Sequence, residues 1–96
     1  MTETRDARID VVPQPIADLK TEVIEGELLL YDPRATKAVY LNPSAAVIWS
    51  LCDGRRRVHE IIQLIGEGYP EAKDNLTEEV LDTLGQLCEN GVLVAK

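Results

Sequence analysis

The part of the sequence that most constrains the fold is residues 41–54, which read LNPSAAVIWSLCDG. Asn42 can accept a hydrogen bond from the free amides of a first helical turn, and Pro43 already has the φ angle that the first helical position requires. Gly54, just beyond the apolar run, is typical of a helix stop. The segment therefore predicts a short helix from Pro43 to about Cys52, entered directly from a strand.

Three short strands are predicted upstream of this helix. Apolar residues in Leu19–Ile24 and Glu27–Tyr31 flank a tight turn at Glu25-Gly26, a pattern typical of a hairpin. Residues 32–36 carry Asp and Pro at positions that favour a turn, and Lys37–Leu41 alternates its side chains between two faces. Because sequential strands with short connections usually pair, we expect a three-stranded antiparallel meander with at least one unpaired edge.

Two more helices are predicted downstream. From Val58 to Gly66 or Gly68, apolar side chains recur at helical spacing, which is the clearest periodicity in the chain. A third helix is expected from about Thr77 to Glu89, with Pro70 ending the second. The apolar run Val92–Val94 is either a short strand or a tail packed on the core. The predicted fold class is α+β and winged-helix-like, a three-stranded antiparallel β meander followed by a three-helix bundle.

The start of the chain differs from the rest in its composition. Residues 1–18 are mostly polar and hold Pro13 and Pro15, which resist both helix and central strand. We expect a flexible N-terminal arm over residues 1–18 and one folded domain over residues 19–96. Within the arm, Ile9–Val12 is β-prone, which leaves open its addition to a sheet edge or a homodimer formed through the arm.

Length and charge narrow the class of function. A chain of 96 residues can build one small core but has little room for a deep substrate cleft. Seventeen acidic against ten basic residues give a net charge of −7, which disfavours nucleic acid as a partner. The sequence has no apolar run long enough to cross a membrane and no apolar stretch near its start, so we expect a cytoplasmic protein without a membrane partner.

Residues that usually carry catalysis are sparse. One His, two Cys far apart in the sequence and no glycine-rich phosphate loop supply neither a catalytic triad, a metal site nor a nucleotide cradle. We therefore expect no enzyme activity, no metal and no cofactor. Cys52 and Cys88 are interpreted as reduced core thiols, with a disulfide or a reactive thiol as the alternatives. A basic run is either a solubilising loop or a docking patch for an acidic partner, and consists of Arg55, Arg56 and Arg57.

Five short motifs follow one another in a distinctive order. They are YLNPSAA at residues 40–46, DG at 53–54, EII at 60–62, YP at 69–70 and NGVL at 90–93. In this combination they resemble the PqqD-like family of precursor-peptide recognition domains, over roughly residues 21–94. The resemblance implies three strands followed by a winged-helix-like bundle, and a domain that binds the leader segment of a ribosomally made peptide for a modifying enzyme, often a radical SAM protein. Arg57 stands where relatives commonly have a Thr that caps the second helix.

The resemblance also implies where the leader binds. A disordered leader would add as a strand to the exposed edge of the third strand and lay its side chains against the third helix. Carried onto this sequence, the strand side of the site consists of Lys37, Ala38, Val39, Tyr40 and Leu41. The helix side consists of Leu81, Leu84, Gly85 and Cys88.

The function so implied is a non-catalytic adaptor that holds a leader peptide and presents it to a modifying enzyme. One alternative is a winged-helix transcriptional regulator, which would need a basic recognition helix. The third helix is instead acidic, with Glu78, Glu79, Asp82 and Glu89. A second alternative is a small structural subunit of a larger enzyme, for which the β-prone segment Ile9–Val12 is the main indication.

Overall fold

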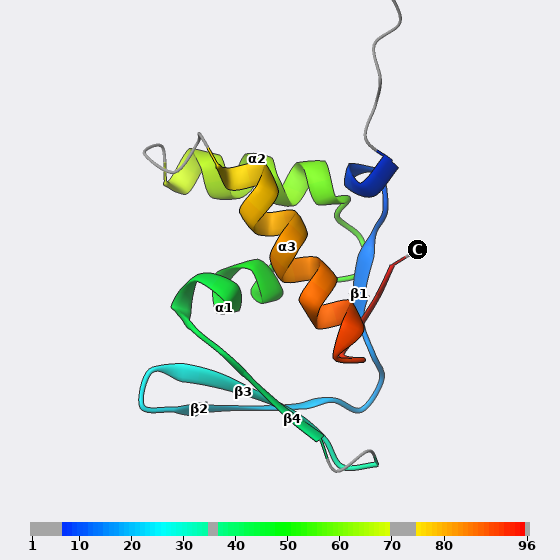
Figure 1. The fold of residues 1–96 in the computed structure, drawn as a ribbon, viewed down its shortest axis with the longest axis vertical. Helices are drawn as coiled ribbons and strands as arrows, with labels where there is room; N and C mark the ends of the chain where they lie inside the picture. Colours follow the sequence, from blue (N-terminus) through cyan, green and yellow to red (C-terminus); the bar gives the residue numbers. More distant parts are fainter. Residues whose placement is uncertain (1–6, 35–36, 70–74, 96) are drawn as a thin grey trace, which may run out of the picture.

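The computed structural model describes residues 7–34, 37–69 and 75–95. The three helices lie at one end of the molecule and a three-stranded sheet at the other (Figure 1). The elements in chain order are a 3₁₀ turn η1 (Ala7–Ile9), β1 (Pro13–Pro15), β2 (Lys20–Ile24), β3 (Glu27–Asp32), β4 (Lys37–Leu41), α1 (Pro43–Ser50), α2 (Val58–Gly68), α3 (Leu76–Glu89) and β5 (Leu93–Ala95). The predicted α+β, winged-helix-like class is confirmed.

The predicted meander forms a sheet with the order β2-β3-β4, antiparallel throughout. Glu25 and Gly26 both adopt positive φ, 51° and 83°, the geometry that lets a two-residue turn match the twist of its strands. At the next turn, Asp32 Oδ1 accepts a hydrogen bond from the backbone N–H of Arg34 at 3.0 Å. The rest of that predicted turn, residues 35–36, lies outside the described residues.

The first helix begins as the sequence predicts. Asn42 Oδ1 accepts a hydrogen bond from the Ala45 N–H at 2.8 Å, and Pro43 occupies the first turn. α1 ends at Ser50, two residues before the predicted limit, because the Cys52 N–H already bonds the Trp49 carbonyl in a tighter turn. Gly54 then takes a φ of 79° at the stop.

The other two helices match their predicted ranges within one residue. α2 lacks a side-chain cap from Arg57. The Glu60 carboxylate instead accepts a hydrogen bond from the Arg57 backbone N–H at 2.7 Å, so this N–H at the start of the helix has a partner. α3 begins at Leu76, one residue before the prediction. The predicted stop at Pro70 and the loop that follows it lie outside the described residues.

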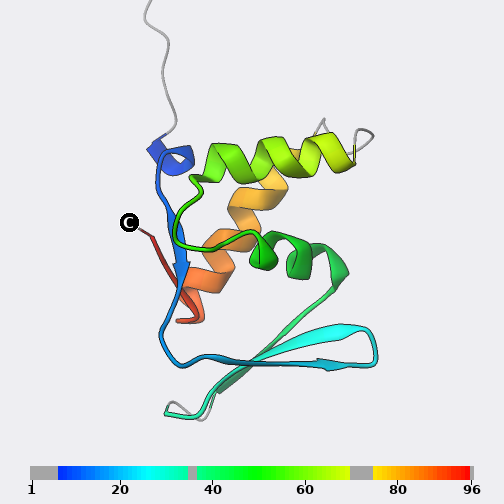
Figure 2. The ribbon, with the colours of Figure 1, turned by 180° about the vertical axis from the view of Figure 1, so that it is seen from behind.

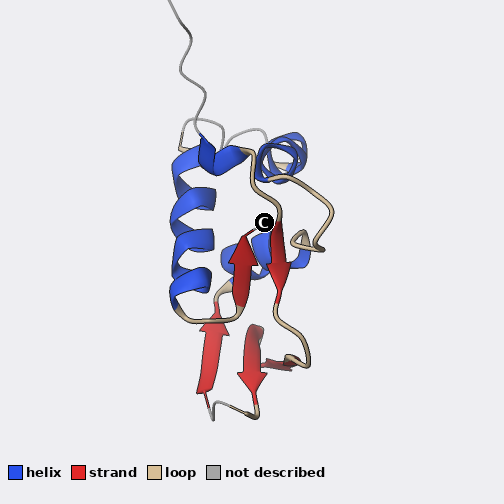
Figure 3. Cartoon of the chain, turned by 90° about the vertical axis from the view of Figure 1, so that its right-hand side faces the viewer, coloured by secondary structure: helices blue, strands red, loops and turns tan. Residues whose placement is uncertain are grey.

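The N-terminal segment differs from the predicted loose arm. β1 pairs antiparallel with β5, and the two strands lie side by side apart from the larger sheet (Figure 3). On its other side, the Pro13 carbonyl accepts a hydrogen bond from the Gly54 N–H at 3.1 Å, and the Val11 carbonyl accepts one from Val58 at 3.0 Å. Prolines are tolerated in so short a strand at a sheet edge. The prediction for residues 1–6 lies outside the described residues.

The strand pairing also bears on the N-terminal β-prone segment. Ile9 and Val11 pack against the core, and the strand forms just after them. For Val92–Val94, the sequence left open a short strand or a packed tail. The structure has a strand here, β5. A homodimer through the N-terminal segment stays a prediction, and its strand here is already paired within the same chain.

One apolar core joins all layers. α1 lies between the three-stranded sheet and α3, as the view from behind shows (Figure 2). Among the described residues, every buried side chain is hydrophobic. The most deeply buried are Leu30, Val58, Ile61, Val80 and Leu87. No described helix is long and apolar enough to span a bilayer.

Candidate functional site

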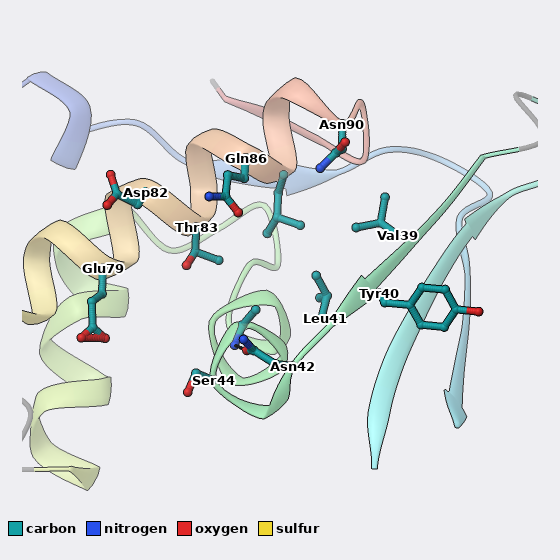
Figure 4. Close-up of a pocket in the computed structure, with 12 residues that line it drawn as sticks. Val39, Tyr40, Leu41, Asn42, Ser44, Glu79, Asp82, Thr83, Gln86 and Asn90 are labelled. Carbon is teal, nitrogen blue, oxygen red and sulfur yellow. Dashed lines mark hydrogen bonds between the residues drawn. The ribbon is translucent and has the colours of Figure 1, made fainter. Parts of the chain in front are cut away.

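A groove of about 460 Å³ separates the edge of the three-stranded sheet from α3 (Figure 4). β4 and the start of α1 form one wall, and a polar face of α3 forms the other. The lining residues are Val39, Tyr40, Leu41, Asn42, Ser44, Ala45, Glu79, Asp82, Thr83, Gln86, Leu87 and Asn90. A groove between an edge strand and a helix is a shape that an extended peptide can enter.

The strand wall presents unsatisfied backbone groups to the groove. β4 is the last strand of its sheet, so within the described residues it pairs with β3 alone. Ile24 and Glu27 close a two-residue turn and form a hydrogen-bonded pair, and bonded and non-bonded pairs alternate from there. A residue of β3 that bonds β2 does not bond β4, so the bonded pairs between β3 and β4 involve the other residues of β3. Ala38 and Tyr40 are therefore in non-bonded pairs with β3, and their N–H and C=O groups point to the free edge. This edge is a template for one more strand.

Side chains of β4 alternate between the groove and the opposite face of the sheet. Val39 lies toward the groove, whereas the Tyr40 ring points away from it and is 61% exposed (Figure 4). The five residues of the predicted strand side all lie on β4, and leader binding by them stays a prediction. The backbone of Ala38 faces the free edge, whereas Lys37 is in a bonded pair with Asp32 of β3. Val39, Tyr40 and Leu41 line the groove.

The helix side differs from the prediction. Leu81, Leu84, Gly85 and Cys88 lie on the face of α3 opposite to β4, where they border a separate hollow of about 240 Å³ beside β1 and β5. This hollow does not adjoin the free edge of β4. The packing of β5 and the N-terminal segment against that face decides the arrangement.

The actual helix wall is polar. Glu79, Thr83, Gln86 and Asn90 recur at spacings of three and four, which places them on one face of the helix. With them, Asp82 and Leu87 complete the wall. The sequence therefore shows a polar stripe on the helix opposite the apolar one. Such a stripe usually faces solvent, and the sequence pattern alone does not distinguish a solvent-facing stripe from one that lines a groove.

The groove carries negative charge. Glu79 and Asp82 are exposed, and no Lys, Arg or His is among the lining residues whose side chains the structure describes. In the part of the chain that the structure describes, the ion pairs are Arg34–Asp32 and Arg56–Asp53, and neither includes Glu79 or Asp82.

The arginine run lies between α1 and α2, away from the groove. Arg57 Nη1 donates to the Asp10 carbonyl at 2.6 Å, and Arg56 Nη1 donates to the Leu51 carbonyl at 3.3 Å. Backbone hydrogen bonds from Arg55 and Arg56 hold the pKa of Asp53 below its ordinary value. Two of the three guanidinium groups thus hold loop backbone in place. Docking through the run stays a prediction, and Arg55 is the member best placed for it.

The two cysteines have different surroundings. Both are free thiols, and Cys52 is buried as predicted, whereas Cys88 is exposed rather than part of the core. Burial, with smaller contributions from Cys88 and Asp53, raises the pKa of the Cys52 thiol to about 12. Burial also raises the pKa of Cys88. No cluster of three His, Cys, Asp or Glu side chains within the described ranges could hold a metal ion.

Alkylation rates should reflect this difference. At pH 8 a thiol with so high a pKa is almost entirely protonated, and the thiolate is the reactive form. We expect iodoacetamide to modify Cys52 about a hundredfold or more slowly in the native protein than in urea, with Cys88 reacting first. Peptide mass spectrometry over time would measure both rates. Native modification of Cys52 as fast as that of Cys88 would contradict this burial.

A family model and two relatives show which family the chain belongs to. The family model of coenzyme PQQ synthesis protein D (PqqD) matches residues 27–93. The chain belongs to the PqqD family. Two relatives named "PqqA binding protein", from Klebsiella pneumoniae and its strain 342, are each 37% identical to it over 65 residues. This match spans 68% of the chain and 66% of the length of each relative.

A solved structure shares the PqqD fold described above. The chain of "TbiB1 in Complex with the TbiA(beta) Leader Peptide" superposes with a TM-score of 0.71 at 21% sequence identity. The match covers 83% of this chain and 93% of that chain. The two chains thus share the same overall fold.

Proposed function

We propose that this PqqD family member is a non-catalytic adaptor that binds the leader segment of a ribosomally synthesised precursor peptide. The leader adds as a strand to β4 and lies in the groove against α3. The bound leader then holds its precursor close to a modifying enzyme, which raises the local concentration of the segment to be modified. A radical SAM maturase is the enzyme class that the family resemblance implies.

The observation that carries the proposal is the unpaired edge of β4 beside the groove. Main-chain groups of Ala38 and Tyr40 would bond a guest strand whatever its side chains, and the groove would receive alternate side chains of that strand. The names of the Klebsiella relatives and of the TbiB1 complex describe peptide binding by those proteins, which supports the same role here.

The alternative of a transcriptional regulator fits the structure less well. The exposed face of α3 carries Glu79 and Asp82, which repel a phosphate backbone. A guest strand on β4 would, moreover, cover this part of α3 rather than leave it free for a DNA groove.

Amide chemical shifts would test the binding site directly. The experiment titrates the ¹⁵N-labelled protein with short precursor peptides encoded next to its gene and follows each amide. We expect the largest shifts at Ala38 and Tyr40 and on the groove face of α3 at Thr83 and Gln86, with little change in β2. Shifts confined to β1 and β5, or no shift with any of these peptides, would contradict the proposal.

A further inference from the structure

The groove does not end at the start of α1. A second hollow, of about 350 Å³, opens where the start of α1, the end of α2 and the start of α3 meet. It is lined by Pro43, Ser44, Val47, Ile48, Ile65, Tyr69, Leu76 and Glu79. Ser44 and Glu79 line both spaces, so the hollow adjoins the groove on the side of α1.

The two spaces differ in chemistry. The walls of the second hollow are mostly aliphatic, and Tyr69 stands at it with 52% of its surface exposed. Such a concave, largely apolar surface gains most from a large apolar side chain, which would displace water from it. Glu79, at the junction, is exposed and forms no ion pair among the described residues.

We propose that the hollow receives a large apolar side chain of the same leader peptide, and that Glu79 pairs with a Lys or Arg close to it in the leader. This inference rests on the proposed function and specifies the class of leader: a strand-forming stretch joined to a basic residue and an apolar anchor. Charge complementarity supports this choice, because Glu79 and Asp82 both line the groove and an acidic leader would be repelled.

Charge reversal at Glu79 tests the pairing with a close control. Glu79→Lys and Glu78→Lys change the net charge equally and occupy the same first turn of α3, but Glu78 does not line either space. With the precursor peptide that binds best in the titration above, we expect Glu79→Lys to weaken binding about fivefold or more at low salt. Glu78→Lys should stay within about twofold. Isothermal titration calorimetry would measure both.

A second pair of variants tests whether the hollow receives the apolar side chain of the leader. Tyr69 and Leu64 are both partly exposed on or next to α2, but only Tyr69 lines the hollow. Tyr69→Ala should weaken binding several-fold, and Leu64→Ala should not. A peptide variant with Glu in place of its Lys or Arg should regain affinity for the Glu79→Lys protein.

The outcomes separate this inference from the proposed function. If a peptide shifts the β4 amides but binds the Glu79→Lys and Tyr69→Ala proteins as tightly as the original, the extended site is refuted and strand addition survives. If no peptide shifts β4, both proposals fall. Thermal unfolding followed by circular dichroism checks that each variant is folded before its affinity is compared.

Discussion

Replacing Ala38 with proline is expected to weaken leader binding about tenfold or more while the protein remains folded. The substitution removes an N–H that points to the free edge of β4, and the ring stands where the guest strand would lie. One lost strand hydrogen bond costs about 1 kcal/mol, and the steric conflict adds to it, which together reach the 1.4 kcal/mol that corresponds to a tenfold change. The bonds between β4 and β3 stay intact, because this residue does not donate to β3.

Val23→Pro is the matched control. Val23 lies on β2, at the opposite edge of the same sheet, is 72% exposed, and by the same alternation points its N–H away from β3. Both variants therefore introduce a proline at an edge position, but only one of those edges borders the groove. Fluorescence anisotropy with a labelled leader peptide would compare them. Equal affinities for Ala38→Pro and the original protein would exclude pairing along β4.

Truncating Leu30 to alanine should destabilise the protein by about 2–5 kcal/mol, a large part of the 5–15 kcal/mol expected for a small domain. Leu30 has no exposed surface and lies where β3 packs beneath α1. The loss has two sources: the buried methyl groups that are removed and the cavity that remains. Urea unfolding followed by Trp49 fluorescence would give the change in midpoint, since Trp49 belongs to the same core.

Leu29→Ala provides the comparison on the adjacent residue. Leu29 pairs with Tyr40 and lies on the outer face of the sheet, where it is only partly buried. The same chemical change should therefore cost under about 1 kcal/mol. Similar losses at both positions would show that the sheet does not present Leu30 to the helices.

Much of the fold was predictable because it depends on short-range chemistry. The Asn42-Pro43 pair starts α1 through one side-chain hydrogen bond and one pre-set dihedral angle, both local. Glu25-Gly26 closes the hairpin for the same kind of reason, and the apolar stripe of α2 follows from helical geometry. The strand half of the candidate site was predictable too, since an edge strand next to a helix start follows from their order.

The N-terminal segment was not predictable in this way. Its two prolines disfavour regular structure locally, but they fit a short edge strand once a partner is present. That partner is β5, at the other end of the chain, and the Gly54 N–H adds a bond from a third region. Pairing between segments so distant in the sequence cannot be predicted from the residues of either segment alone.

The sequence by itself determined which residues share each face of α3. Tertiary packing decided which neighbour each face meets: the face with Leu81 and Gly85 turns toward β1 and β5, and the face with Glu79 and Gln86 turns toward β4. Helical periodicity is a local property of the backbone, whereas the direction of a face depends on how the whole core excludes water. The polar character of the groove, and with it the kind of peptide it suits, therefore emerged only from the folded chain.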